Sequence, residues 1–125
     1  MGSEMCIRDS GKVERVIYPG LMDGETRRRA DAHLNSGYGG LVGMEVKGGL
    51  EVGKNFIDAL ELLYHVANIG DARSLAIHPA STTHSQMQAD ELLQAGVTPG
   101  YVRLSIGIEH VDDIIGDLDQ ALAKA

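Results

Sequence analysis

The sequence predicts an α/β domain in which helices cover a small four-stranded sheet, mostly antiparallel or mixed. Short apolar runs bounded by Gly and Pro alternate with segments whose apolar residues recur every three or four positions. The 125 residues have the length of one domain, and 43% apolar with 23% charged residues is ordinary for a globular protein. The same pattern fits an α+β arrangement, because it leaves the strand order open.

The predicted strands are short, rich in β-branched or apolar residues, and closed by turn residues. Pro19 ends the first of them and Pro79 the third, because proline cannot continue a hydrogen-bonded ladder. The four predicted strands cover residues 13–17, 41–46, 74–77 and 101–106.

Helical periodicity is strongest from Glu51 to Val66, where apolar residues form one continuous face, and Gly70 is the expected end of this helix. The other helices are shorter or later in the chain. We expect one after the cap residue Asp23 that stops by Gly37, one that begins near Ser85 or Gln88 and stops at Gly96, and one over residues 111–122.

The first ten residues, MGSEMCIRDS, show no apolar periodicity. We interpret residues 1–10 as adaptor or tag sequence fused to a truncated reading frame, so that the domain is residues 11–125. Cys6 is the sole cysteine and lies in this leader. The sequence therefore predicts neither an internal disulfide nor a cysteine-based zinc site.

The charge of the chain argues against a nucleic-acid partner, because the net charge is -7 and the pI is about 5.1. The run Arg27 to Arg29 is the one cluster of basic residues, and we interpret it as a solvated helix surface. No apolar segment approaches the roughly 18 to 20 residues that cross a bilayer, and no signal sequence is evident. We therefore expect no membrane partner and a cytoplasmic location.

Arg103 is the strongest candidate for chemistry, because it stands between Val102 and Leu104 on a predicted strand. Removing a guanidinium from water costs several kcal/mol unless an anion offsets that cost. A carboxylate that accepts two parallel hydrogen bonds is the commonest partner. Two other interpretations stay open: a pair with an Asp or Glu of this chain, or an edge strand that leaves the side chain in water.

Other polar residues give weaker signals. Ser74 could face a ligand at the start of its strand or could bond its own turn. Residues 78–84 gather two histidines with hydroxyl side chains, but no nucleophile elbow surrounds any serine. The histidines at positions 33, 65, 78, 84 and 110 include no zinc-binding pair on one helix face, so we expect no metal.

Three ordered motifs give the sequence a family resemblance: Asn68 to Leu75 (NIGDARSL), His78 to Gln86 (HPASTTHSQ) and Val102 to Glu109 (VRLSIGIE). Together they resemble the C-terminal domain of the transsulfuration family of pyridoxal-phosphate (PLP) enzymes. This family contains cystathionine synthases and lyases, methionine lyases and sulfhydrylases. The resemblance runs from Val13 to the end of the chain. The wording of residues 68–86 is most similar to the O-acetylhomoserine sulfhydrylase branch.

The resemblance implies roles for particular residues. It makes the chain the small C-terminal domain of a fold-type I PLP enzyme, in which Arg103 holds the substrate α-carboxylate with Ser74 and Leu75 beside it. Arg73 would lie near the substrate side chain, and Thr83 is similarly placed. The implied reaction is γ-replacement, in which sulfide or a thiol displaces acetate from O-acetylhomoserine to give homocysteine or methionine.

The resemblance also implies missing parts. The lysine that binds PLP belongs to an upstream domain in this family, and the lysines at positions 12, 47, 54 and 124 lack its Ser-x-Thr-Lys context. We therefore expect the chain alone to be inactive, with an N-terminal PLP domain as its partner in a homotetrameric parent. The alternatives are a cystathionine γ-synthase or γ-lyase fragment, a free-standing amino-acid-binding module, or a domain that serves only interactions.

Overall fold

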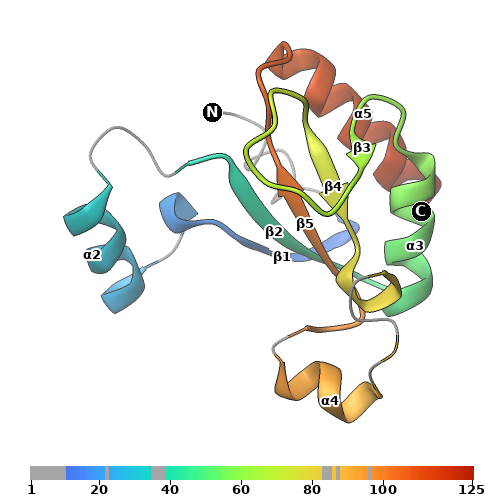
Figure 1. The fold of residues 1–125 in the computed structure, drawn as a ribbon, viewed down its shortest axis with the longest axis horizontal. Helices are drawn as coiled ribbons and strands as arrows, with labels where there is room; N and C mark the ends of the chain where they lie inside the picture. Colours follow the sequence, from blue (N-terminus) through green and yellow to red (C-terminus); the bar gives the residue numbers. More distant parts are fainter. Residues whose placement is uncertain (1–10, 22, 35–38, 83–85, 87, 96) are drawn as a thin grey trace.

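The structure, a computed structural model, describes residues 11–21, 23–34, 39–82, 86, 88–95 and 97–125. Among these residues, five strands form one sheet in the order β1-β2-β5-β4-β3 (Figure 1). The pairs β1–β2, β2–β5 and β5–β4 are antiparallel, and β4–β3 is parallel. The strands are β1 (Val13–Ile17), β2 (Leu41–Val46), β3 (Tyr64–His65), β4 (Leu75–Ile77) and β5 (Tyr101–Ser105). The predicted α/β class and mixed sheet are confirmed, whereas the count of four strands was wrong by the edge strand β3.

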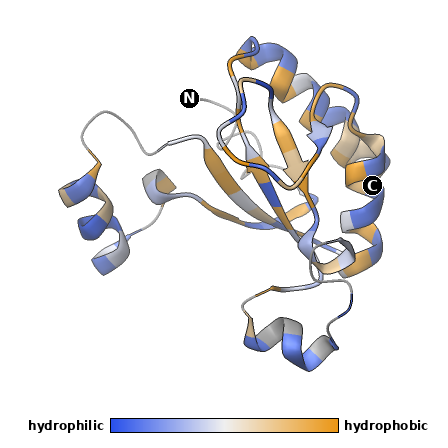
Figure 2. Cartoon of the chain, viewed as in Figure 1, coloured by the Kyte–Doolittle hydropathy of each residue, from blue (hydrophilic) through white to orange (hydrophobic). Residues whose placement is uncertain are grey.

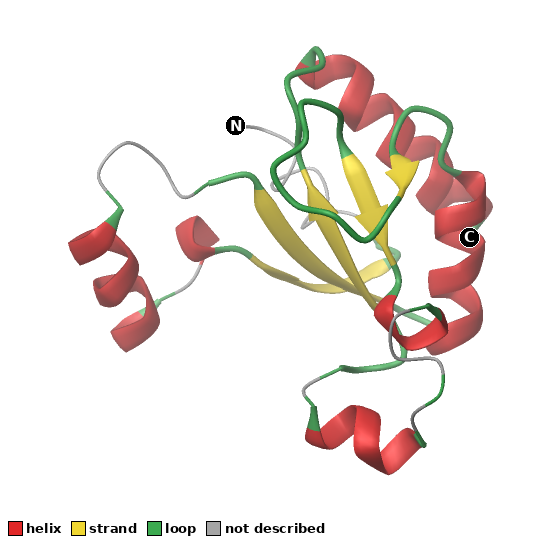
Figure 3. Ribbon diagram, viewed as in Figure 1, coloured by secondary structure: helices red, strands yellow, loops and turns green. Residues whose placement is uncertain are grey.

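Two of the helices cover one face of this sheet, and two lie away from it. Figures 1 and 3 show α3 and α5 side by side over the sheet, with α2 and α4 standing apart. The helical segments are η1 (Pro19–Leu21), α2 (Gly24–His33), α3 (Gly49–Ala59), η2 (Pro79–Ser81), α4 (Ala89–Gln94) and α5 (Val111–Lys124). Because α3 and α5 cover one face of the sheet, the opposite face is the one that a ligand could reach.

The hydrophobic core lies between the sheet and the pair α3 and α5. Alternate residues of β2 and β5 point toward these helices because side chains alternate across a strand. Figure 2 shows apolar colouring along the strands and the two helices. Burial of each large apolar side chain contributes about 1.5–3 kcal/mol. The core residues of these four elements are Val42, Met44, Val46, Phe56, Ile57, Val102, Leu104, Ile114, Leu118, Ala121 and Leu122.

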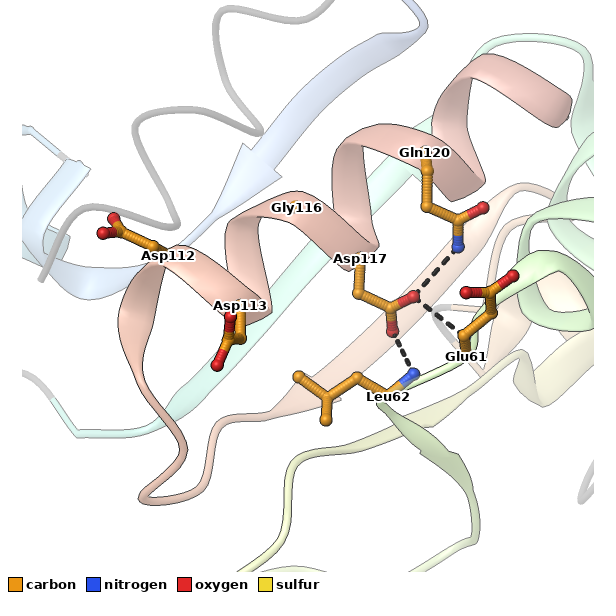
Figure 4. A pocket seen from close by; sticks show the side chains of 7 residues that line it. All are labelled: Glu61, Leu62, Asp112, Asp113, Gly116, Asp117 and Gln120. Carbon is orange, nitrogen blue, oxygen red and sulfur yellow. Dashed lines mark hydrogen bonds between the residues drawn. The ribbon is translucent and has the colours of Figure 1, made fainter.

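Helix α3 ends at Ala59, so the prediction that it runs to Val66 was wrong beyond that point. The carboxylate of Asp117 in α5 accepts hydrogen bonds from the backbone amides of Glu61 and Leu62 at 2.8 Å (Figure 4). It also accepts one from the backbone amide of Leu63 at 2.9 Å. These amides would serve the helix if it continued. A contact from a distant helix therefore turns the chain, although Leu63 is still buried as the periodicity predicted.

Local hydrogen bonds shape the two projecting helices. Asp23 precedes α2 as expected, but its side chain makes no cap hydrogen bond. The arginines of α2 are solvated and form ion pairs with Glu25 and Asp31 on the same helix. In α4, the Glu91 carboxylate accepts the amide of Gln88 at 2.9 Å, which fixes Gln88 directly before the helix. The predicted stop Gly37, the cap Ser85 and the stop Gly96 lie outside the described residues.

Candidate functional site

The face of the sheet opposite α3 and α5 carries polar side chains from the two central strands. Val102 and Leu104 of β5 point into the core, so Arg103 between them points the other way. Arg103 pairs with Gly43 of β2 and with Ile77 of β4. We call this surface the polar face, and its residues on the central strands are Gly43, Glu45, Tyr101, Arg103 and Ser105.

Arg103 has no carboxylate partner within the described part of the chain. One of its guanidinium nitrogens, Nη2, donates to the backbone carbonyl of Asn68 at 3.3 Å. An edge position is excluded because β5 lies between β2 and β4. The side chain is half-buried. A guanidinium with most of its donors free, fixed on a central strand, is suited to an external carboxylate.

The segment of residues 66–73 passes beside the polar face. Besides the Asn68 carbonyl, the Gly70 amide reaches the sheet and donates to the Ser105 hydroxyl at 3.4 Å. Gly70 adopts φ +79°, a left-handed conformation that glycine adopts without strain. Residues 66–73 therefore lie along one side of the Arg103 side chain, and we call this segment the wall.

Ser74 lies at the end of that wall and is fully buried. Its amide and hydroxyl donate to the two carboxylate oxygens of Glu109, at 2.7 and 2.9 Å, and its Oγ accepts the Gly107 amide at 2.9 Å. Burial raises the pKa of Glu109, but the hydrogen bonds from Ser74 outweigh it, and the pKa lies below its ordinary value. Both donors of Ser74 are thus bonded to Glu109. The sequence placed Glu109 in a motif but gave no role for it.

Gly107 is needed for this arrangement because the two segments touch there. A Cβ at this position would lie 2.2 Å from the carbonyl oxygen of Ala72. The neighbouring amide of Ile108 donates to the same oxygen at 2.9 Å. Residues 107–109 are therefore joined to residues 72–74, which fixes the end of β5 against the start of β4.

Arg73 lies at the outer end of the same wall and is exposed. Its guanidinium forms an ion pair with Asp71 at 3.4 Å and stacks over the ring of Tyr64, 4.6 Å from the centroid. The backbone and side-chain hydrogen bonds from Arg73 lower the pKa of Asp71, and the bond to Asp71 raises the pKa of Arg73. The Arg73 side chain is thus held in one position by Asp71 and Tyr64.

The structure brings four of the five predicted site residues to one region. Arg103 and Leu75 lie on paired strands, with Ser74 directly before β4 and Arg73 before it. Leu75 is buried and pairs with Ser105. Thr83 lies outside the described residues. The residues missed by sequence reasoning, Glu109 and the Asn68 carbonyl, act through contacts between distant segments.

His78 is buried, and both of its ring nitrogens are hydrogen-bonded within the chain. Its Nε2 donates to the Pro99 carbonyl at 2.5 Å, so its Nδ1 accepts from the Ser81 hydroxyl at 2.8 Å. Burial lowers the pKa of His78, which favours this neutral form. Gly53 packs on the ring, since a Cβ there would lie 2.6 Å from Nε2. The ring ties the end of β4 to the turn before β5.

A pocket lies beside the start of α5, the helix that covers the face of the sheet opposite Arg103. Figure 4 shows Asp117 there, bonded to backbone amides and to Gln120. Among the described residues, no group of three or more His, Cys, Asp or Glu side chains is arranged to hold a metal ion. No described helix is long and apolar enough to cross a membrane. The pocket is lined by Glu61, Leu62, Asp112, Asp113, Gly116, Asp117 and Gln120.

Comparison with known proteins identifies relatives over most of the chain. The O-acetyl-L-homoserine sulfhydrylase of Leptospira meyeri is 55% identical over 112 residues, which is 89% of this chain and 25% of the relative. The O-acetyl-L-homoserine sulfhydrylase 1 of Thermus thermophilus is 49% identical over 112 residues, 90% of this chain and 27% of the relative. The chain therefore spans about a quarter of the length of these proteins.

A solved structure agrees with this relationship. The crystal structure of an O-acetylhomoserine (thiol)-lyase from Campylobacter jejuni, described with a pyridoxyl-lysine, is 37% identical and has a TM-score of 0.87. The similarity covers 97% of this chain and 29% of that one. A sequence model of the Cys/Met metabolism PLP-dependent enzymes matches residues 5–123. The chain therefore belongs to the family of Cys/Met metabolism PLP-dependent enzymes.

Proposed function

We propose that this chain is the domain that binds the substrate carboxylate in a PLP-dependent O-acetylhomoserine sulfhydrylase. The observation that carries the proposal is the guanidinium of Arg103, which lies on a central strand and has only a backbone carbonyl as its described partner. The relatives named O-acetyl-L-homoserine sulfhydrylase, 55% and 49% identical, support this branch of the family.

The described residues suit a substrate carboxylate better than they suit PLP itself. A lysine that holds PLP must stand in an enclosed pocket. The lysines at positions 12, 47, 54 and 124 are all exposed. We therefore propose that the cofactor site lies in the part of the relatives that this chain does not span.

The proposed role of the chain is to orient the substrate. The guanidinium of Arg103 binds the α-carboxylate, and its bond to the Asn68 carbonyl limits the directions in which the fork can point. Ser74 and Leu75 hold β4 beside it, with Ser74 fixed by Glu109. Arg73, at the outer end of the wall, is placed to meet the substrate side chain, and Thr83 stays a candidate for the same region.

The chain is best understood as one part of a larger protein. We propose that residues 11–125 form the domain, that residues 1–10 are adaptor sequence, and that a PLP domain precedes it in a cytoplasmic homotetramer. The coverage supports the larger protein, since the matched part is 25–29% of the relatives and of the solved structure.

A chimera tests the proposal. The 112 matched residues of the Leptospira meyeri enzyme are replaced by those of this chain, and homocysteine formation from O-acetyl-L-homoserine and sulfide is measured. We expect the chimera to be active and Arg103→Met to lower kcat/KM by about 100-fold, the effect of losing about 3 kcal/mol of a paired charge. A matched variant, Arg15→Met, removes an arginine of the edge strand β1 and should leave kcat/KM within about twofold.

The results also separate the alternatives. A folded chimera in which Arg103→Met acts no more strongly than Arg15→Met would overturn the assignment of the carboxylate site. A chimera that cleaves methionine and does not consume sulfide would favour the γ-lyase type. A chimera without any activity, beside a chain that binds free amino acids, would favour the amino-acid-binding module.

A further inference from the structure

Four residues of the polar face form the corners of a rectangle on β2 and β5. Glu45 lies opposite Tyr101, and Gly43 lies opposite Arg103. The four point to the same side of the sheet because their neighbours Met44 and Val102 are in the core. Diagonal neighbours in such a rectangle are roughly 7–8 Å apart, within reach of long side chains. Glu45 and Arg103 are diagonal neighbours of opposite charge, yet no ion pair joins them within the described chain.

The ring of Tyr101 lies on the other diagonal. A Cβ built on Gly43 would be 2.8 Å from both the ring edge, Cε2, and the hydroxyl oxygen of Tyr101, so the far end of the ring rests on the Gly43 backbone. The two diagonals of a rectangle cross. The ring therefore stands between the carboxylate of Glu45 and the guanidinium of Arg103, and the absence of a side chain at Gly43 makes room for it.

The side chains on either side of the ring have other partners. Glu45 accepts hydrogen bonds from Arg15 at 3.1 Å and from the Thr98 hydroxyl at 2.9 Å. On the other side of the ring, Arg103 donates to the carbonyl of Asn68, which precedes β4 in the chain. Tyr101 is half-buried, and burial raises the pKa of its phenol, so the ring is neutral and adds no competing charge.

We propose that Tyr101, seated on Gly43, is a positioning residue that separates Arg103 from Glu45 and keeps the guanidinium available for the substrate carboxylate. The proposal rests on the carboxylate-binding function proposed above. Without the ring, Glu45 is the internal carboxylate that competes with substrate. If nine-tenths of the molecules form the internal pair, the apparent dissociation constant of the substrate rises about tenfold.

The structural test uses the full chain without a ligand. In a crystal structure of Tyr101→Val, which keeps a good strand residue but cannot reach Gly43, we expect a guanidinium nitrogen of Arg103 within 4 Å of a Glu45 carboxylate oxygen. Tyr101→Phe, the matched control, keeps the ring and should leave the two groups apart. An Arg103 side chain that remains on the Asn68 carbonyl in Tyr101→Val would overturn the proposal.

The functional test uses the same variants in the chimera. Tyr101→Val should raise the KM for O-acetyl-L-homoserine about tenfold with little change in kcat, and adding Glu45→Gln should restore it. A merely structural role for the ring predicts no rescue by Glu45→Gln, and that result would sink the idea. If the unsubstituted chimera is inactive, the proposed function fails, while the Arg103 to Glu45 distance in the crystal still decides the role of Tyr101.

Discussion

The two faces of the sheet are built on different principles. The face under α3 and α5 is apolar and closely packed, and its residues touch many neighbours of similar chemistry. The polar face has a few specific pairs, such as Arg103 with Asn68 and Tyr101 with Gly43. Stability should therefore depend on the first face and ligand selection on the second. Substitutions on each face test this division.

Phe56→Ala on α3 should cause the largest loss. The side chain is fully buried in the core, and replacing a buried Phe by Ala costs about 3–5 kcal/mol of unfolding free energy. Urea denaturation followed by circular dichroism measures the change. Leu50→Ala, on the exposed surface of the same helix, is the control and should stay within about 0.5 kcal/mol. Similar losses for the two variants would contradict the packed core described here.

Asp117→Asn should lower the unfolding free energy by about 2–3 kcal/mol at neutral pH. The substitution replaces one carboxylate oxygen, which accepts hydrogen bonds from backbone amides, by an NH2 group that can only donate. Burial raises the pKa of Asp117, but the bonds from Glu61 and its neighbours hold it below the ordinary 3.8. The stabilisation is therefore present above about pH 3.8 and lost as the pH falls through the lower folded pKa. Urea titrations at several pH values should show the wild type and Asp117→Asn converging in acid. A difference that grows on acidification would refute this account.

Glu109→Gln should cost about 1–2 kcal/mol, since the side-chain amide can accept only one of the two Ser74 donors. Amide hydrogen exchange at Ser74 and Gly107 should accelerate together, because both belong to the same junction. Glu14→Gln, on the exposed surface of β1, is the matched control and should change neither quantity. Unchanged exchange at Ser74 would show that Glu109 does not hold this junction.

Arg103→Met should change stability least, by no more than about 0.5 kcal/mol, because the side chain makes a single hydrogen bond to the rest of the described chain. Thermal unfolding of the 125-residue chain measures it. Combined with the expected 100-fold loss in the chimera, this result would separate binding from folding. A loss of 2 kcal/mol or more would mean that Arg103 has a structural partner instead.

The covered face was largely predictable from the sequence. Alternation in residues 41–46 and the helical period of 111–122 each report on burial of the residue itself, so β2 and α5 agree with their predicted positions. The end of α3 was not predictable, because Asp117 reaches it from 54 residues away. A pattern local to residues 51–66 contains no trace of that carboxylate.

The polar face was predictable only in part. Arg103 was recognisable because a guanidinium between two apolar strand residues needs an anion or water as its partner. Glu109 was not, because a Glu in a turn after a strand is ordinary until Ser74 is known to face it. The role of Tyr101 depends on cross-strand register with Gly43, which a single sequence does not give.

Helix α2 has a consequence for motion. None of its ten residues is buried, and helices shorter than roughly 12–15 residues are marginal in water. Its ion pairs add only a few tenths of a kcal/mol each. Unwinding of α2 therefore costs far less than opening the sheet, and its amide protons should exchange with solvent in brief local events while those of β5 stay protected until the whole domain unfolds.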